Sequence, residues 1–404
     1  MTIKNIPVGY KDSPLGIIPM EWEVKRLGDI CTYFKSGKSI TSSNLNNDGC
    51  YPVYGGNGLR GFSCDYTHDG TYILIGRQGA LCGNINYVEG KNYISEHAIA
   101  VQSRENMLWL KYKLEYWNLN RYSESSAQPG LSVEKLVRYK LTLPPLAEQE
   151  KIAEILSTWD KAIEKQTQLI QKLELRKKGL MQQLLTGKCR LPGFSEPWKK
   201  VRLGDIGSPY NGLSGKNKEN FESGDACFIP YINIFLNERI DTNNLESVEI
   251  GIEEHQNKVK YGDIFFTVSS ETPNEVGMSS VLLEPLDNTY LNSFCFGYRL
   301  NDFLTLSPFF ATYLFRAEYF RHCMYILAQG STRFNISKSD VMNLKINVPS
   351  IKEQTAIAQV LTAADREIEL AQQKLELLRQ QKHGLMQQLL TGKKRVKILT
   401  FKFM

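Results

Sequence analysis

The chain carries a long internal duplication. The ten residues GLMQQLLTGK occupy Gly179–Lys188 and recur unchanged at Gly384–Lys393, a displacement of 205 residues. A second pair of matching segments, Trp22–Ile30 and Trp198–Ile206, is displaced by 176 residues. Because the two displacements differ, the segment between the matching ends must be longer in the second copy. The sequence is therefore a tandem repeat with similar ends and different interiors, and it predicts two halves related by a pseudo-twofold axis.

Length and composition are those of a globular protein. The chain has 404 residues, of which 42% are apolar and 11% are aromatic, so two or three domains with their own cores are expected. The formal net charge is +6 and the isoelectric point is about 8.7. This mild positive excess is compatible with a nucleic-acid partner, but many proteins with neutral partners are equally basic.

The cysteines and the apolar segments indicate the cellular compartment in which the protein works. The eight cysteines are scattered and form no CxxC pair, which is typical of a reducing cytosol. The first residues lack the basic-then-apolar layout of a signal peptide, and no apolar run approaches the roughly 18 residues of a membrane span. The sequence therefore predicts a soluble, cytoplasmic protein with no membrane partner.

The repeated ends have the periodicity of a coiled coil. Apolar residues step alternately by four and three over four heptads in each copy, and Lys177 and Lys382 interrupt the two seams at the same place. Two unrelated amphipathic helices would explain the pattern less well, because both the seam and its interruption are duplicated. The apolar seam residues are Ile152, Leu156, Trp159, Ile163, Ile170, Leu173, Leu180 and Leu184 in the first copy, and Ile357, Leu361, Ile368, Leu375, Leu378, Leu385 and Leu389 in the second.

The ends of both helices are marked in the sequence. Pro144, Pro145 and Pro349 forbid helix before each seam, so each helix is expected to begin just after its proline. Gly187 and Gly392 are suited to a left-handed position that closes each helix. Each helix is then about 40 residues, or roughly 60 Å long.

The two interiors have a different character. They contain short β-rich runs such as GTYILIGRQGALCGNINYV in the first copy and GDIFFTVSS in the second, punctuated by Gly, Asn, Asp and Ser. Such runs are typical of irregular, strand-rich α+β domains. The predicted order is domain, long helix, domain, long helix.

The repeated blocks and the domain openings together resemble a known family. LPPLAEQEKIAEIL…LMQQLLTGK from Leu143 and its copy from Val348, the W…RLGDI openings, Gly130–Ser132, and STRFNIS at Ser331–Ser337 resemble the conserved regions of type I restriction-modification specificity subunits. The resemblance covers essentially the whole chain. It implies an α+β protein in which two target recognition domains are separated by two long antiparallel coiled-coil helices. Each domain would read one half of a bipartite, asymmetric double-stranded DNA target.

The same resemblance implies partners and a division of labour. Two copies of a modification subunit, an adenine-N6 methyltransferase, would dock on the helices, and restriction subunits would join a larger complex. The chain itself would be non-catalytic and would bind no cofactor; S-adenosylmethionine, ATP and Mg are expected on the partner subunits. The implied segments are an N-terminal arm (1–20), target recognition domain 1 (21–143), a first spacer helix region (144–190), target recognition domain 2 (191–347), a second spacer helix region (348–395) and a basic C-terminal tail (396–404).

Candidate DNA-binding residues are those whose side chains can reach base edges or phosphates from turns. Any one of them can equally be a surface residue without a ligand. The candidates are Lys38, Tyr54, Asn57, Arg60, Arg77, Gln78 and His97 in the first domain, and Lys216, Asn217, Asn233, Arg239, Ser270, Arg333 and Lys338 in the second.

Several motifs that suggest other chemistry have plainer explanations. A phosphate loop ending at Lys38 would need glycine where the chain has Thr32, so a nucleotide site is not expected. No Asn/Asp-Pro-Pro-Tyr/Phe stretch, which an amino-methyltransferase needs, is present. The remaining candidates are too loosely spaced: Cys64, His68, Cys82 and His97 for a metal, and Lys258, Asp263 and Glu271 for a nuclease.

Two other functions stay open at this point. One is a self-contained DNA methyltransferase or nuclease that carries recognition domains, and the other is a coiled-coil adaptor that does not bind DNA.

The leading hypothesis, that the helices set the distance between two DNA-reading domains, makes a prediction about the target. Four residues inserted between Gly187 and Pro192 are predicted to lengthen the DNA spacer by one or two base pairs, at about 1.5 Å per residue and 3.4 Å per base pair.

Overall fold

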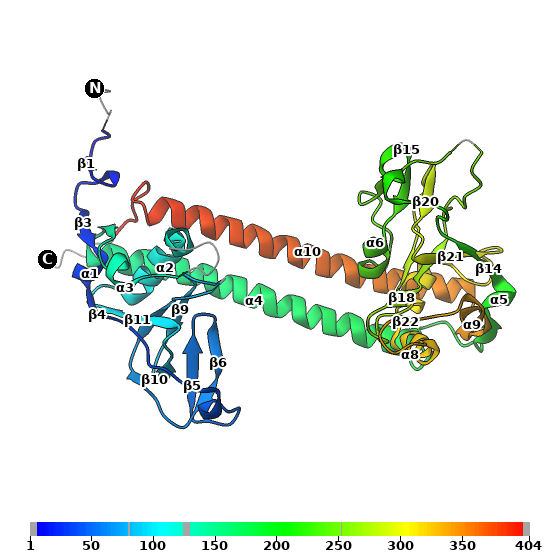
Figure 1. Ribbon diagram of the computed structural model, residues 1–404, viewed down its shortest axis with the longest axis horizontal. Coiled ribbons are helices and arrows are strands. Elements are labelled where there is room, and N and C mark those ends of the chain that lie inside the picture. The colour runs from blue at the N-terminus through cyan, green and yellow to red at the C-terminus, as the bar shows by residue number, and fades with distance from the viewer. Residues whose placement is uncertain (1–5, 80, 124–129, 252, 399–404) are drawn as a thin grey trace. The chain divides into compact units, whose positions relative to one another are not determined.

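The computed structural model describes residues 6–79, 81–123, 130–251 and 253–398 (Figure 1). The predicted arm (1–20) and tail (396–404) therefore lie partly outside the described residues. The chain divides into unit 1, residues 1–167 with 373–404, and unit 2, residues 168–372. Each unit holds one strand-rich domain, called domain 1 in unit 1 and domain 2 in unit 2, and a part of both long helices.

The two long helices begin and end as the sequence predicts. Helix α4 spans Leu146–Leu184 and α10 spans Ile351–Leu389, 39 residues each. Each begins directly after the predicted proline segment. Gly187 and Gly392 follow the two helices with φ of +71° and +75°, a backbone conformation that favours glycine.

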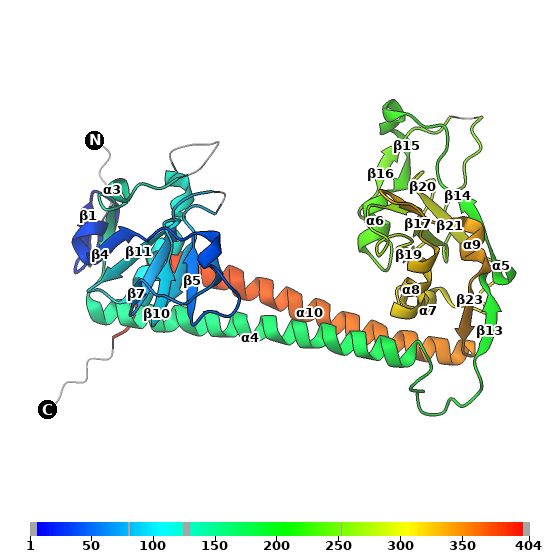
Figure 2. The same cartoon turned by 60° about the horizontal axis from the view of Figure 1, so that its bottom comes forward.

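Packing within each unit shows that α4 and α10 run antiparallel. In unit 1, Leu156 near the start of α4 shares a core with Leu389 near the end of α10. In unit 2, Leu184 at the end of α4 shares a core with Leu361 near the start of α10. Within each unit the two helices lie side by side in both ribbon views (Figures 1 and 2). All fifteen predicted apolar seam residues are buried or half-buried.

Domain 1 is built on two four-stranded sheets. Their orders are β4-β11-β8-β9 and β6-β5-β10-β7, and β3 pairs with β12 to close the domain at its base. The strands are β1 (Tyr10–Ser13), β2 (Gly16–Pro19), β3 (Glu23–Arg26), β4 (Cys31–Ser36), β5 (Tyr51–Gly55), β6 (Gly58–Ser63), β7 (His68–Asp69), β8 (Tyr72–Gly76), β9 (Ile85–Val88), β10 (Lys91–Ile94), β11 (Ala98–Ser103) and β12 (Lys140–Leu143). The helices are α1 (Leu27–Ile30), η1 (Ser42–Asn44), α2 (Met107–Trp117), η2 (Leu119–Tyr122) and α3 (Val133–Leu136).

Domain 2 repeats this plan with other lengths. Its sheets have the orders β14-β21-β17-β19 and β16-β15-β20, and β13 pairs with β23 at the base. The strands are β13 (Lys199–Arg202), β14 (Gly207–Asn211), β15 (Phe221–Ile229), β16 (Glu246–Val248), β17 (Ile264–Thr267), β18 (Ser269–Ser270), β19 (Ser279–Val281), β20 (Thr289–Leu291), β21 (Cys295–Leu300), β22 (Phe334–Asn335) and β23 (Lys345–Val348). The helices are α5 (Leu203–Ile206), η3 (Lys218–Asn220), α6 (Tyr231–Leu236), α7 (Pro308–Leu314), α8 (Glu318–Leu327) and α9 (Lys338–Asn343).

In unit 1 a three-residue cluster, called clamp 1, fastens domain 1 to both helices. The hydroxyl of Tyr112 in α2 donates a 2.6 Å hydrogen bond to Asp160 of α4, and the ammonium of Lys382 in α10 donates to the same carboxylate. Burial acts to raise the pKa of Asp160, but the hydrogen bonds from Lys382 and Tyr112 outweigh it, and this pKa is lowered. The resulting stabilisation is therefore present above the unfolded-state pKa of about 3.9 and is lost as the pH falls through the folded-state value.

Unit 2 contains the equivalent cluster, called clamp 2. Tyr313 in α7 donates a 2.5 Å hydrogen bond to Asp365 of α10, and Lys177 of α4 lies 2.7 Å from the same carboxylate. Lys177 and Lys382 are the residues that interrupt the predicted seam. The structure explains the interruption, because each lysine supplies the cation of a clamp.

A second pair of equivalent contacts ties the end of each helix to the start of the other. Arg190, just after α4, donates hydrogen bonds of 2.5 and 2.6 Å to Glu353 of α10. Arg395, after α10, donates at 2.8 Å to Glu148 of α4, which also accepts a bond from the Trp22 indole at 2.9 Å. Both glutamates are at most 1% exposed, so these are buried, charge-assisted bonds.

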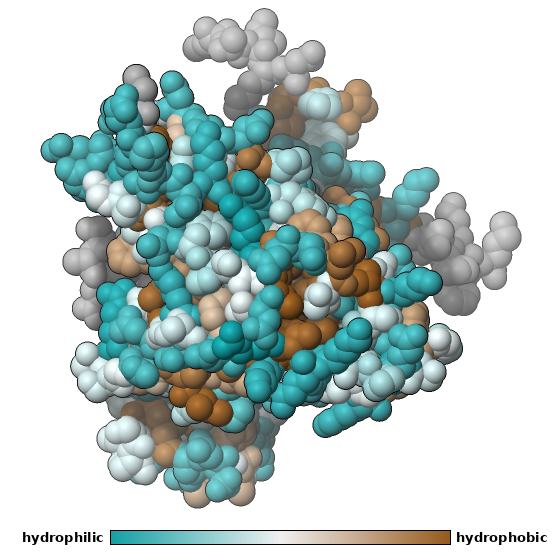
Figure 3. Space-filling model, turned by 90° about the vertical axis from the view of Figure 1, so that its right-hand side faces the viewer, coloured by the Kyte–Doolittle hydropathy of each residue, from teal (hydrophilic) through white to brown (hydrophobic). Residues whose placement is uncertain are grey.

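The face of unit 2 turned to the viewer in Figure 3 is mostly hydrophilic, with hydrophobic groups in small patches. Among the described helices, none combines the length and the apolar character needed to cross a bilayer.

Candidate nucleic-acid interface

In domain 1 the ends of several strands and loops meet on one surface. The GGNG turn between β5 and β6 lies against it, because a Cβ on Gly56 would stand 2.9 Å from the carbonyl oxygen of His97. Backbone hydrogen bonds tie the other segments together: Ser95 donates to Tyr54 (2.9 Å), Arg77 to His97 (2.8 Å) and Lys38 to Ile94 (2.9 Å).

The seven sequence candidates of domain 1 lie on or beside this surface, called surface 1. Lys38, Asn57, Arg60 and Gln78 are exposed, while Tyr54, Arg77 and His97 are half-buried. Nδ1 of His97 lies 3.2 Å from Oε1 of Gln78, so the two side chains form one polar pair. Surface 1 therefore offers three cations and several amide and imidazole groups, a set that can bind phosphates and base edges.

Domain 2 builds the equivalent surface, called surface 2, with the same backbone bonds. The Val268 amide donates to the Phe294 carbonyl at 3.0 Å, as Arg77 does to His97. The Ile336 amide donates to Val268 at 3.1 Å, as Leu131 does to Arg77 at 2.9 Å. Phe294 and the residues after Val268 therefore occupy the places of His97 and Gln78.

The side chains of surface 2 differ from those of surface 1. Phe294 is 59% exposed, Arg333 is exposed, and Tyr231 stacks on Phe235 with ring centroids 5.8 Å apart. They surround a shallow cavity of about 360 Å³, lined by Tyr231, Ile232, Phe235, Ser269, Ser270, Glu271, Glu275, Phe294 and Arg333.

Only two of the seven domain 2 candidates line this cavity. Ser270 and Arg333 line the cavity; Ser270 is 8% exposed and bonds Glu275 at 3.2 Å. Asn217 is exposed and caps η3, and Lys338 donates to Asn211 away from this cavity.

The structure speaks against three candidates as direct readers. Asn233 is 1% exposed, and its amide group bonds the carbonyls of two loop residues, 241 and 244, at 2.9 and 2.8 Å. Arg239 bonds Tyr313 and belongs to the contacts of clamp 2. The Lys216 side chain is 7% exposed, and its ammonium forms an ion pair with Glu254. These three side chains hold the domain together and are not offered to a ligand.

The other chemistry-bearing motifs also have structural partners. Gly37 before Lys38 packs against β10, since its Cβ would lie 2.2 Å from the Ile94 carbonyl oxygen. His68 bonds Tyr33 at 3.2 Å and Thr67 at 2.7 Å, and Cys82 donates to the Arg77 carbonyl at 3.4 Å. Asp263 is 1% exposed and is bonded by Arg299 and Tyr210. The described part of the chain contains no cluster of three His, Cys, Asp or Glu side chains placed to hold a metal.

Comparison with known proteins decides the family. Residues 19–175 and 195–380 match the family described as the type I restriction modification DNA specificity domain, once in each half of the chain. The chain belongs to this family. Its two matches confirm the resemblance and the fold class that the resemblance implies.

Specificity subunits are among the similar proteins. The type I restriction enzyme EcoprrI specificity subunit of Escherichia coli is 42% identical over 159 residues, which cover 37% of this chain and 39% of that protein. The type I restriction enzyme MjaVIII specificity subunit of Methanocaldococcus jannaschii is 27% identical over 424 residues, covering 95% of each. The fold is also shared with a chain of a solved structure titled "Structural basis underlying complex assembly and conformational transition of the type I R-M system". The two chains are 16% identical and align with a TM-score of 0.57, over 93% of this chain and 99% of that one.

Membership in the specificity-domain family bears on the predicted function. Specificity subunits of type I systems recognise DNA within a multi-subunit complex, in which partner subunits carry the catalysis. The self-contained enzyme and the adaptor without DNA are not supported. As a specificity subunit, the chain needs two surfaces that bind DNA, and surfaces 1 and 2 are the candidates.

Sequence reasoning missed the aromatic part of surface 2. Its candidates are mainly basic, amide and other polar residues, and Tyr231, Phe235 and Phe294 are not among them. The signal was present in the repeat: His97, within SEHAI, and Phe294, within NSFCF, each directly precede a central strand, β11 and β21.

Proposed function

We propose that the chain reads a bipartite, asymmetric double-stranded DNA sequence, with surface 1 on one half-site and surface 2 on the other. One observation carries the proposal: the two domains build the same backbone arrangement and present different side chains on it. A shared backbone gives two readers that approach DNA in the same way. Different side chains then select different bases.

The side chains suggest how each surface reads. On surface 1, Arg77 and Gln78 can form paired hydrogen bonds with guanine and adenine edges, and Lys38 and Arg60 can hold phosphates. On surface 2, Arg333 can bind a guanine edge or a phosphate, while the exposed ring of Phe294 can contact a thymine methyl group. The two half-sites would therefore differ in composition.

The proposed partners follow the pseudo-twofold pattern of the helices. Two modification subunits would dock on equivalent parts of α4 and α10, one in each unit, and restriction subunits would join them. The equivalent clamps support two equivalent docking positions. Methyl transfer from S-adenosylmethionine and ATP- and Mg-dependent steps would belong to these partners.

The proposed domain boundaries can be tested by exchange. Strand β3 pairs with β12, bringing Glu23 opposite Leu143, so segment 21–143 begins and ends at adjacent places. In domain 2, β13 pairs with β23, bringing Lys199 opposite Val348 near the ends of segment 191–347. Segments closed in this way can be replaced with little disturbance of the helices.

We expect that replacing residues 21–143 by the same segment of a relative changes one half of the methylated motif and leaves the other half and the spacer unchanged. Methylome sequencing of cells that express the chimera with the modification subunit gives the readout. The matched control exchanges 191–347 and should change the opposite half. A change in both halves from a single exchange would show that the domains do not read independently.

Alanine substitutions on surface 1 should weaken specific binding. Gln78→Ala and Arg77→Ala are each expected to cost about 1–3 kcal/mol on the cognate site, since each removes a paired contact with a base edge. Lys25→Ala, at an exposed position of β3, is the control and should change binding little. Competition binding against single-base variants of the target, at fixed salt, measures the effect. Uniform weakening on all sequences would assign these residues to phosphate contacts instead.

A further inference from the structure

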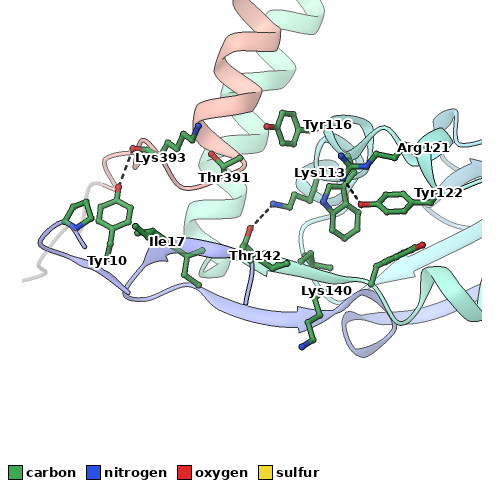
Figure 4. Close-up of a pocket in the computed structure, with 16 residues that line it drawn as sticks. Tyr10, Ile17, Lys113, Tyr116, Arg121, Tyr122, Lys140, Thr142, Thr391 and Lys393 are labelled. Atoms are coloured by element: carbon green, nitrogen blue, oxygen red, sulfur yellow. Dashed lines mark hydrogen bonds between the residues drawn. The ribbon is translucent and has the colours of Figure 1, made fainter. Parts of the chain in front are cut away.

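Unit 1 contains a cavity of about 930 Å³ that the DNA-reading role does not use (Figure 4). It is lined by residues on and beside β1 and β2, by α2 and η2, by β12, and by the segment after α10. Its volume falls in the range of small-molecule sites. The lining residues are Pro7, Tyr10, Leu15, Ile17, Ile18, Lys113, Tyr116, Trp117, Arg121, Tyr122, Tyr139, Lys140, Leu141, Thr142, Thr391 and Lys393.

The lining combines aromatic rings with positive charge. Five of the sixteen lining residues are Tyr or Trp, four are Lys or Arg, and none is Asp or Glu. Tyr122 and Tyr139 lie 4.5 Å apart between ring centroids, and Trp117 meets Tyr139 at 6.5 Å. Arg121 lies over the Tyr122 ring at 4.7 Å, whereas the ammonium of Lys140 turns away from the cavity in Figure 4.

Lys113 is a buried amine, and among the residues that the structure describes no carboxylate pairs with it. It is 4% exposed, and its ammonium donates to Thr142 Oγ1 at 2.8 Å and to the Leu390 carbonyl at 2.6 Å. An ammonium has three N–H donors, and groups in the described residues accept two of them. Burial lowers the pKa of Lys113 to about 7.

The fold does not require a lysine at this position. Tyr112 and Tyr313 make the same bond in the two clamps, so Lys113 and Leu314 are equivalent residues. Leu314 is fully buried in unit 2. A buried leucine serves the same packing role without the cost of burying an amine. The lysine therefore points to a role specific to the cavity in unit 1.

We propose that this cavity binds a small planar aromatic anion, whose ring packs among Trp117, Tyr122 and Tyr139 and whose negative group accepts from Lys113 and Arg121. The anion would supply a counter-charge for Lys113, whose buried position strengthens a charge-assisted bond. The site does not suit one of two identical partner subunits, because unit 2 has Leu314 in the equivalent place. The proposal does not depend on the reading of DNA.

The probe 1-anilinonaphthalene-8-sulfonate, an aromatic anion, tests the site by fluorescence titration of the full chain. We expect one saturable site, with affinity reduced at least tenfold in Lys113→Met and unchanged in the matched variant Leu314→Met. Arg121→Ala, at an exposed position, should weaken binding with little effect on folding. Equal affinity for the probe in the native chain, Lys113→Met and Arg121→Ala would overturn the proposal.

The pH dependence separates a charge contact from simple packing. Lys113 is charged below a pH of about 7, so affinity for the anion should fall as the pH rises through that value, by about tenfold per unit at most. Arg121, Lys140, Lys393 and the four tyrosines are the other titratable groups that line the cavity. The same decline with pH in Lys113→Met would overturn the assignment to Lys113.

Competition distinguishes the source of the ligand. Displacement of the probe by adenosine monophosphate supports a nucleotide, and displacement by indole-3-acetate supports an aromatic carboxylate. Displacement only by the purified modification subunit would overturn the proposal, since the cavity would then be part of a protein interface.

Discussion

Leu156→Asp is expected to unfold unit 1 or to detach α4 from α10 within it. Leu156 is fully buried and shares a core with Met386 and Leu389 of α10. Truncating a buried leucine to alanine costs about 2–5 kcal/mol, and a carboxylate left there without a partner adds to that cost. The loss is comparable to the whole stability of many domains. Thermal unfolding followed by circular dichroism, with limited proteolysis of α4, measures it.

The same helix supplies the control. Leu175 of α4 is 71% exposed, so Leu175→Asp should change stability by no more than about 0.5 kcal/mol. Leu361→Asp tests the equivalent place in unit 2, where Leu361 is fully buried. A Leu156→Asp protein that unfolds at the same temperature as the native chain and still binds its modification subunits would contradict the antiparallel seam.

The seam itself could be predicted from sequence because helical periodicity is a local property. Its interruption was visible too, at Lys177 and Lys382, but its cause was not. Asp160 and Asp365 are also separated by 205 residues, so the partners of both lysines were present in the repeat. Pairing them requires the antiparallel register, which brings residue 160 beside residue 382, and periodicity along one helix carries no such information.

The candidate site was harder to predict for a physical reason. Residue type indicates what a side chain can bind and not which way it points. Asn233 and Arg239 have the chemistry of base readers, yet their polar atoms are bonded to loop carbonyls and to a helix within unit 2. Phe294, in contrast, reads as a core residue and is largely exposed. Its equivalence to His97 rests on backbone hydrogen bonds between distant segments, which no local pattern reveals.

Packing within unit 2 changes where the spacer should be tested. From sequence, the junction between Gly187 and Pro192 is the natural place to lengthen the distance between the two readers. In the structure, Leu184 and Leu185 of α4 belong to the core of unit 2, and Arg190 bonds Glu353. Domain 2 is thus held on the helices by contacts on both sides of the junction. Four residues inserted after Leu191 should form a loop and leave the DNA spacer unchanged.

A paired insertion in the helices is therefore expected to have the largest effect on target choice. Thr167 and Gln372 are equivalent residues of α4 and α10 at the border between the two units. Seven residues inserted after each would add one heptad to both helices and preserve the seam. Each helix would lengthen by about 10.5 Å, close to three base pairs at 3.4 Å each. The half-sites should stay the same and the unspecified spacer should grow by about three base pairs.

Methylome sequencing of the paired-insertion variant, expressed with the modification subunit, gives the new spacer directly. Binding to the original target should fall by about 10²-fold or more, because one reader at a time can engage and the gain from linking two readers is lost. Inserting the heptad in α4 alone breaks the match between the helices and should destabilise the protein instead. If the paired-insertion variant is folded and its complex with the modification subunit still methylates the original motif with the original spacer, these helices do not set the distance between half-sites.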